Sequence, residues 1–280
     1  MRKKLIIIFA ILTATVFFLF FQNNALVTTD LPIHSEKIPE GFEGYKIVQL
    51  SDLHSKSFGK NQRYLVQKVS QLKPNMIVFT GDLVDSKKYD EDASLVLMEE
   101  LVQIAPVYYV TGNHEWWSGK FESLEGKLTD IGVKVMRNTA EEITHDGSKI
   151  QLVGIDDPAK ATESYGERSL AEEALKHSLA SVTESDSFTV LLAHRPELFS
   201  LYSQSKIDLV FSGHAHGGQV RLPFIGGLIA PNQGLFPDYT AGKYTHDRTT
   251  MIVNRGLGNS IIPLRILNRP EIIVVTLNSE

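Results

Sequence analysis

Residues 76 to 82 read Met-Ile-Val-Phe-Thr-Gly-Asp, an apolar run that ends in a glycine and a carboxylate. A run this short, bounded by glycine, is typical of a buried strand. Ligands of α/β proteins collect outside the carboxyl ends of strands, so Asp82 is a candidate site residue. A single Gly-Asp pair is usually an ordinary turn. The case for a site therefore depends on whether the pattern recurs.

Four further apolar strands end in the same way, with aspartate, asparagine or histidine directly after them. Five of the nine histidines lie at these strand ends. The other four, in polar or loop-like surroundings, are expected at the surface. The five strand ends carry Asp52 and His54, Asp82, Asn113 and His114, His194, and His214 and His216.

The chain has no cysteine, so a transition-metal site must use His, Asp, Glu and Asn. The strand ends together offer five imidazoles, two carboxylates and one amide oxygen. That set is too large for one tetrahedral zinc ion and suits two ions of higher coordination number. A shared carboxylate would hold two such ions ~3.5–4 Å apart, the arrangement used in phosphate-ester hydrolysis.

The series of motifs resembles the calcineurin-like metallophosphoesterases, and in particular a membrane-anchored bacterial branch with Gly-His-x-His-Gly-Gly-Gln. The resemblance runs across most of residues 45 to 277. It implies a four-layer α-β-β-α sandwich, two mixed sheets flanked by helices. Helical spacing of apolar residues predicts helices over 61–72, 90–104, about 118–129 and about 169–180. The matching motifs are Asp52-x-His54, Gly81-Asp82, Gly112-Asn113-His114-Glu115, His194 and Gly213-His214-x-His216.

The resemblance also implies the roles of these residues. One divalent ion would be held by Asp52, His54, Asp82 and His216, and the second by Asp82, Asn113, His194 and His214. Mixed nitrogen and oxygen ligands suit Mn, Fe, Zn and others, so the ligands do not determine which metal binds. A hydroxide bridging the two ions would attack phosphorus, while His114 stabilises the phosphoryl oxygens or protonates the leaving group.

Other polar residues near these motifs are weaker candidates for the site. Arg195 and Arg255 are candidate phosphate-binding residues, although Arg255 suits a loop-stabilising role equally well. Asp156-Asp157-Pro158 most resembles a turn. Glu115 is expected to be structural.

The N-terminus carries Arg2, Lys3 and Lys4, followed by an uncharged apolar run from Leu5 to Phe21. This run predicts a transmembrane helix, with a cleaved signal peptide as the alternative. We expect residues 1–24 to be the anchor and residues 25–280 the catalytic domain. The three cations favour an N-terminus inside and a domain on the far side of the cell membrane. Cleavage would release a secreted protein instead.

Composition limits the partners. Beyond the anchor the chain has 25 basic and 33 acidic side chains, a poor balance for gripping nucleic acid. No protein partner is inferred. The apolar segment 222–231 is either a buried hairpin or an apolar lip that admits an acyl chain or dips toward the bilayer.

The function that follows is metal-dependent hydrolysis of a phosphodiester or pyrophosphate bond. The resembling bacterial branch includes enzymes that act on UDP-diacylglucosamine, so a lipid-linked substrate is one candidate. A non-catalytic metal-binding scaffold and a broad-specificity phosphomonoesterase are the alternatives. The complete ligand set disfavours the scaffold.

Overall fold

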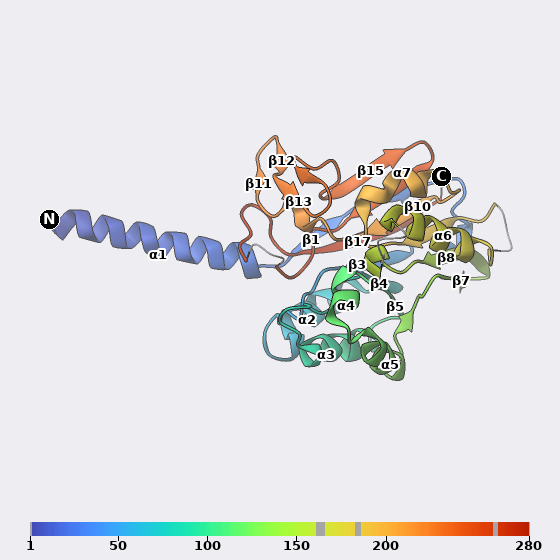
Figure 1. The fold of residues 1–280 in the computed structure, drawn as a ribbon, viewed down its shortest axis with the longest axis horizontal. Helices are drawn as coiled ribbons and strands as arrows, with labels where there is room; N and C mark the ends of the chain where they lie inside the picture. Colours follow the sequence, from blue (N-terminus) through green and yellow to red (C-terminus); the bar gives the residue numbers. More distant parts are fainter. Residues whose placement is uncertain (1, 161–165, 183–185, 260–262, 280) are drawn as a thin grey trace.

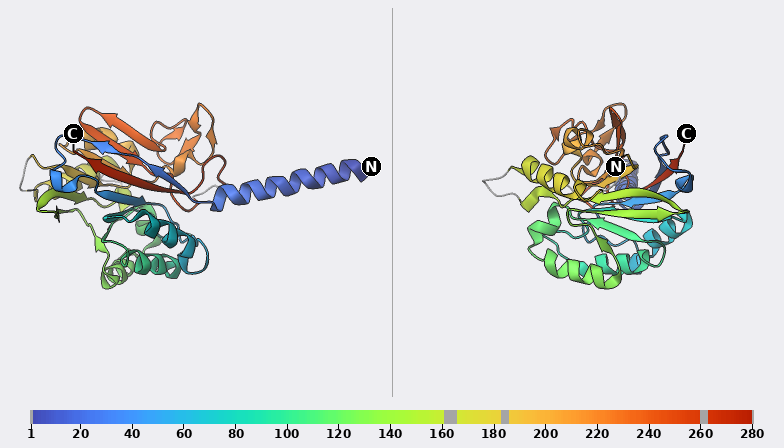
Figure 2. Two further views of the ribbon diagram at one scale, coloured as in Figure 1. Left: turned by 180° about the vertical axis from the view of Figure 1, so that it is seen from behind. Right: turned by 90° about the vertical axis from the view of Figure 1, so that its right-hand side faces the viewer.

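Two β-sheets lie face to face, and helices cover the outer side of each (Figure 1). The structure is a computed structural model that describes residues 2–160, 166–182, 186–259 and 263–279. It confirms the expected four-layer arrangement of two mixed sheets flanked by helices. Figure 2 shows the same layers from two further sides.

The first sheet places Asp82 at the end of one of its inner strands. Strands β3 to β6 run parallel, and β17 pairs antiparallel with β3 and parallel with β1 and β2. The order β1-β17-β3-β4-β5-β6 puts β4 between β3 and β5. The strands are β1 (Val27–Asp30), β2 (Ile33–His34), β3 (Lys46–Leu50), β4 (Met76–Thr80), β5 (Val107–Val110), β6 (Lys134–Val135) and β17 (Glu271–Asn278).

The second sheet has the order β15-β16-β10-β9-β8-β7. Its four inner strands are parallel, and β7 and β15 pair antiparallel at the two edges. A turn at Asp146-Gly147 joins β7 to β8. The strands are β7 (Thr139–His145), β8 (Ser148–Gly154), β9 (Thr189–Leu192), β10 (Leu209–Ser212), β15 (Gly242–His246) and β16 (Thr249–Val253).

Both faces of the inner strands are buried, which explains why their sequences are continuously apolar. In β4, Ile77 and Phe79 pack with α2 (Arg63–Leu72), α3 (Glu91–Leu101) and α5 (Phe121–Ile131). Met76 and Val78, on the other face, pack against the second sheet. The outer face of that sheet is covered by α6 (Glu167–Leu179) and α7 (Phe199–Ser203).

The helix predicted over about residues 118–129 is α5 (Phe121–Ile131), and a short helix that was not predicted precedes it. This preceding helix, α4 (Asn113–Ser118), begins shortly after β5, and the carboxylate of Glu115 accepts the backbone N–H of Gly112 at its N-cap. Gly119, with φ of 66°, ends α4 before α5 begins. Short 3-10 helices lie at Glu40–Phe42, Lys60–Gln62, Pro158–Lys160, Pro196–Leu198 and His216–Gly218.

The segment after the last histidines forms two small hairpins. These are β11 (Arg221–Leu222) with β12 (Gly226–Gly227), and β13 (Ile229–Ala230) with β14 (Gly234–Leu235). The buried-hairpin reading of this segment is wrong for its first turn, because Phe224 and Ile225 are exposed.

The N-terminal helix α1 (Arg2–Asn24) projects away from the domain (Figure 1). By length and composition it is long and apolar enough to cross a membrane. Most of its large apolar side chains from Leu5 to Phe21 are exposed rather than packed on the domain. Only its last turn, with Gln22 and Asn23, is buried.

Candidate metal centre

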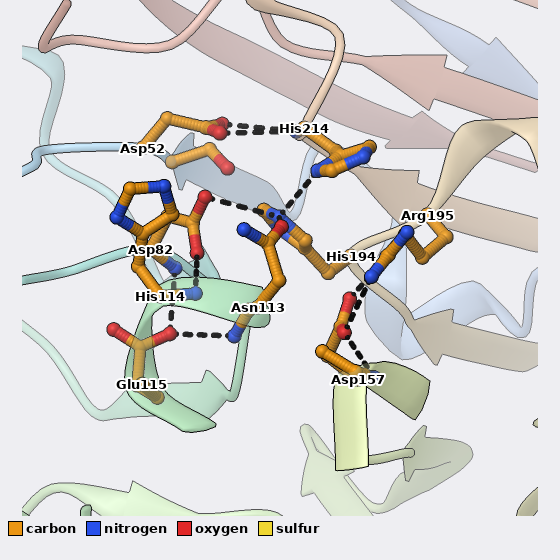
Figure 3. Close-up of polar contacts among 12 residues, drawn as sticks. Asp52, Asp82, Asn113, His114, Glu115, Asp157, His194, Arg195 and His214 are labelled. Atoms are coloured by element: carbon orange, nitrogen blue, oxygen red, sulfur yellow. Dashed lines mark hydrogen bonds and ion pairs between the residues drawn. The ribbon is translucent and has the colours of Figure 1, made fainter. Parts of the chain in front are cut away.

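The predicted ligands meet where the parallel strands of the two sheets end. Strands β3, β4 and β5 deliver Asp52, His54, Asp82 and Asn113 from the first sheet. Strands β9 and β10 deliver His194, His214 and His216 from the second. All seven side chains are buried. Figure 3 shows five of them together with His114 and Glu115.

The backbone at the site is strained. Asp52, His54, Asp82, His214 and His216 all have φ between 47° and 65°, the left-handed region that non-glycine residues seldom adopt. Such conformations persist where surrounding bonds fix them, and they cluster at functional sites. Here the N–H of Asp52 donates to the carbonyl of Gly81 at 2.9 Å, and that of His54 donates to the carbonyl of Asp82 at 3.0 Å.

The first group of candidate ligands is Asp52, His54, Asp82 and His216. Nε2 of His54 lies 3.0 Å from Nε2 of His216. The His216 nitrogen is also 3.3 Å from Oδ1 of Asp52, and the His54 nitrogen is 3.6 Å from Oδ2 of Asp82. Two carboxylate oxygens and two imidazole nitrogens therefore converge within 4.8 Å of one another.

The second group gathers around Nε2 of His194. This nitrogen lies 3.3 Å from Oδ2 of Asp82, 3.1 Å from Nδ1 of His214 and 3.3 Å from Oδ1 of Asn113. The other ring nitrogen, Nδ1 of His194, is 2.7 Å from the carbonyl oxygen of Thr80, an outer contact that orients a ligating imidazole. Asp82 Oδ2 is thus common to both groups.

The side chains suit divalent cations. Burial lowers the pKa of His54 to about 4 and holds the pKa values of His214 and His216 well below their usual range. These three imidazoles are therefore neutral, the form that binds metals. Mixed carboxylate, amide and imidazole ligands fit Mn, Fe or Zn.

Asp82 is held as a carboxylate. Burial acts to raise its pKa, but His194, whose own pKa Asp82 raises to about 10 against the effect of burial, keeps the pKa of Asp82 well below the usual range. Burial and the nearby Asp82 charge raise the pKa of Asp52 to about 7. Two carboxylates this close repel one another, and a cation between them removes that repulsion.

The roles of His114 and Glu115 follow from their bonds. The N–H of His114 donates to Oδ1 of Asp82 at 2.8 Å, and its ring Nδ1 accepts the N–H of Ser86 at 3.0 Å. Because Nδ1 accepts this bond, Nε2 is the ring nitrogen of His114 that can donate. The buried Glu115 carboxylate accepts the N–H groups of Asp82, Leu83, Val84 and Gly112, at 2.6 to 3.2 Å.

The two candidate phosphate-binding arginines are paired inside the domain. Arg195 is 2% exposed and donates to Asp157 at 2.6 and 3.0 Å (Figure 3). Arg255 donates to Glu271 at 2.7 Å. Neither arginine lines the cavity at the metal centre, as far as the described residues show.

A cavity of about 520 Å³ opens over the two ligand groups. Sequence reasoning missed several of its lining residues because they come from loops without periodic patterning. Asp85 Oδ2 is 3.7 Å from Nδ1 of His54, and the Trp117 ring is 5.4 Å from that of His114. The lining residues that were missed include Lys56, Asp85, Ser86, Lys87, Lys88 and Trp117.

Comparison with known proteins agrees with this geometry. A model of the family described as calcineurin-like phosphoesterase matches residues 45–218. The chain is 34% identical over 266 residues to "Uncharacterized metallophosphoesterase YkuE" of Bacillus subtilis, an alignment that covers 93% of this chain and 88% of that protein. It is 30% identical to "Transmembrane protein with metallophosphoesterase domain" of Danio rerio, over 91% of this chain and 58% of that protein.

Among solved structures, phosphopantetheinyl hydrolase (PptH) from Mycobacterium tuberculosis is similar in fold. The TM-score is 0.50 at 15% identity, over 80% of this chain and 96% of that one. The family match spans the ligands from Asp52 to His216, and YkuE aligns with nearly the whole chain. The chain belongs to the calcineurin-like phosphoesterase family.

Proposed function

We propose that this chain is a membrane-anchored phosphoesterase that uses two divalent ions to hydrolyse a phosphodiester or pyrophosphate bond. The observation that carries the proposal is the position of Asp82 Oδ2, which lies within 3.6 Å of His54 Nε2 and 3.3 Å of His194 Nε2. One oxygen shared by two ligand groups is the arrangement that a two-metal site requires.

Two bound cations would supply Lewis acidity, which lowers the pKa of water and stabilises charge on phosphate oxygens. The protein's own residues do the rest. Glu115 fixes the loop that carries Asp82. His114, which lines the cavity, donates from Nε2 to a phosphoryl or leaving-group oxygen. Lys87 and Lys88 also line the cavity, and their charge favours an anionic substrate.

A lipid-linked substrate such as UDP-diacylglucosamine is our candidate for the natural substrate. The cavity can hold more than a single phosphate group, and exposed apolar residues adjoin its rim. We assign residues 1–24 to the anchor and 25–280 to the catalytic domain. Arg2, Lys3 and Lys4 support an inside N-terminus and a domain outside the cell membrane.

The proposal is tested by metal content and turnover of the full chain in detergent. We expect two bound ions per chain by elemental analysis, and hydrolysis of bis-p-nitrophenyl phosphate faster than of p-nitrophenyl phosphate. His114→Ala is expected to keep both ions and lose about 10²–10⁴-fold in kcat. Asp82→Asn is expected to lose both ions together.

Three results would count against the proposal. A single bound ion would overturn the two-metal centre. Activity of the wild type equal to that of both variants would identify a scaffold. Faster hydrolysis of the monoester would identify the broad-specificity phosphomonoesterase.

A further inference from the structure

Exposed apolar side chains are concentrated in one part of the catalytic domain. Outside α1, ten large apolar residues are exposed among the described residues, and eight of them fall between Leu222 and Leu267. Phe224 is fully exposed, Leu235 is 72% exposed and Phe236 is 67% exposed. We call the exposed side chains of residues 222–236 and 264–267 the apolar face. Single exposed apolar residues are ordinary, whereas a contiguous group marks an interaction surface.

The backbone beneath the apolar face is well bonded. The N–H of Leu228 donates to the carbonyl of Gly218 at 3.1 Å, and that of Phe236 donates to the carbonyl of Leu228 at 2.9 Å. The N–H of Arg221 donates to the carbonyl of Ile266 at 3.0 Å, which ties the loop 264–267 to the hairpins. The exposed apolar side chains therefore extend from a hydrogen-bonded backbone, which follows the candidate ligands His214 and His216 in the chain.

The apolar face lies where the N-terminal helix joins the domain. In Figures 1 and 2, the hairpins of β11 to β13 lie at the end of the domain from which α1 projects. Arg269, two residues after Leu267, donates to the carbonyls of Ala25 and Leu26 at 2.9 Å. Its guanidinium also lies 4.8 Å from the centre of the Phe21 ring.

A second contact to the helix lies beside the cavity. The ammonium of Lys56 donates to the carbonyl of Asn23 in the last turn of α1. Lys56 also lines the cavity over the metal centre. The junction is therefore contacted on both sides, by Lys56 and by Arg269.

The charged residues of the segments that carry the apolar face indicate what the face binds. The domain has more acidic than basic residues, yet no acidic residue occurs in 219–237 or in 255–270. The four arginines of these two segments are bonded within the protein, and Arg265 among them is buried. An apolar surface free of carboxylates suits the headgroup layer of a bilayer, because carboxylates are repelled by anionic lipids.

We propose that the apolar face inserts into the surface of the same bilayer that α1 crosses. The occupant is the lipid bilayer because the face adjoins the end of the apolar helix. This inference rests on the membrane anchor proposed above. Pro231, Asn232 and Asn259 of the same two segments line the cavity, so the metal centre opens at the lipid surface.

The absence of cysteine from the chain allows single labels to be placed at will. The full chain is reconstituted in vesicles that contain brominated phosphatidylcholine, and an environment-sensitive fluorophore is attached to one introduced cysteine. The test sites are Phe224→Cys and Phe236→Cys. Phe9→Cys in α1 is the positive control. Thr144→Cys is the negative control, an exposed residue of β7 at the opposite end of the domain (Figure 1).

We expect brominated lipid to quench the labels at 224 and 236 several-fold more than the label at 144. Quenching at 9 without quenching at 224 or 236 would overturn the inference and leave the anchor standing. Absence of quenching at 9 as well would overturn both. Disulfide-linked dimers through the cysteine at 224, without quenching there, would assign the face to a second copy of the chain and overturn the inference.

Discussion

Glu115 positions the loop that carries the shared carboxylate. Its two oxygens accept four backbone N–H groups, three from consecutive residues beginning at Asp82. A glutamine in its place has one accepting oxygen, and its amide would face N–H groups that need an acceptor. Buried donors left without a partner cost about 1–3 kcal/mol each. These hydrogen bonds predict that Glu115 supports metal binding by positioning Asp82, without being a metal ligand itself.

We expect Glu115→Gln to lower the free energy of unfolding by about 2–4 kcal/mol, since at least two donors lose their acceptor. Metal affinity is expected to fall with it, because Asp82 is displaced. Urea unfolding and metal titration measure the two effects. The matched control is Glu100→Gln on the exposed face of α3, which is expected to change neither quantity. Equal stability of the two variants would contradict this role for Glu115.

Arg195 is predicted to stabilise the fold rather than to bind substrate. Its guanidinium makes two bonds to the buried Asp157, and a lysine cannot reproduce this fork. We expect Arg195→Lys to lower the free energy of unfolding by about 3 kcal/mol, the lower end of the cost of breaking a buried ion pair. KM for a soluble diester is expected to stay unchanged. A raised KM at unchanged stability would restore the substrate role that the sequence predicted.

Turns at the strand ends let the two sheets approach closely at the metal centre. A Cβ atom on Gly213 would lie 2.0 Å from Oγ of Ser51 and 2.4 Å from Oδ2 of Asp52. Gly213→Ala must therefore displace Asp52, and we expect metal affinity to fall by about 10–100-fold, as for other changes that disturb the support of a ligand.

The control for this variant is Gly126→Ala in α5, where an added Cβ would meet nothing within 4 Å. An exposed helix gains about 0.5–1 kcal/mol from this change, so the control is expected to be slightly more stable with unchanged metal affinity. Isothermal titration with Mn²⁺ compares the two variants. Unchanged metal affinity in Gly213→Ala would contradict the prediction, because it would show that the backbone at residue 213 can move without displacing Asp52.

Elements with strong periodic patterns were predictable from sequence, and those set by local capping or tertiary contacts were not. The buried strands were found because both of their faces are apolar and a polar turn ends each one. Helix α4 was not predicted because its start depends on a bond between Glu115 and the N–H of Gly112, not on hydrophobic spacing. The sequence left open whether the segment containing Phe224 is buried or exposed, because an apolar segment has the same composition in both cases.

At the scale of the whole molecule, the sequence predicted which residues meet but not how they are oriented. Strand ends bring the seven ligands together because parallel strands share one edge, and that followed from pattern and family resemblance. The attachment of α1 by Lys56 and Arg269 involves residues more than 30 positions from their partners. No local signal in the sequence predicts such contacts, and one of them involves Lys56, which lines the cavity.

The metal centre is expected to contribute to the stability of the whole domain. Seven buried polar side chains from both sheets converge there, and bound cations would replace the repulsion between Asp52 and Asp82 with attraction. Free metal at 100 times Kd stabilises the folded state by about 2.7 kcal/mol. For a chain of this size that corresponds to a rise in Tm of roughly 5–10 °C.

We therefore expect Tm of the full chain in detergent to fall by roughly this amount when a chelator removes the metal, and to recover when Mn²⁺ is restored. Differential scanning fluorimetry measures both steps. Asp82→Asn, which lacks the shared oxygen, is expected to have the same Tm with chelator and with Mn²⁺. A wild-type Tm that is also unaffected by chelation would mean that the two sheets hold this cluster together without cations, against the charge repulsion that the buried carboxylates impose.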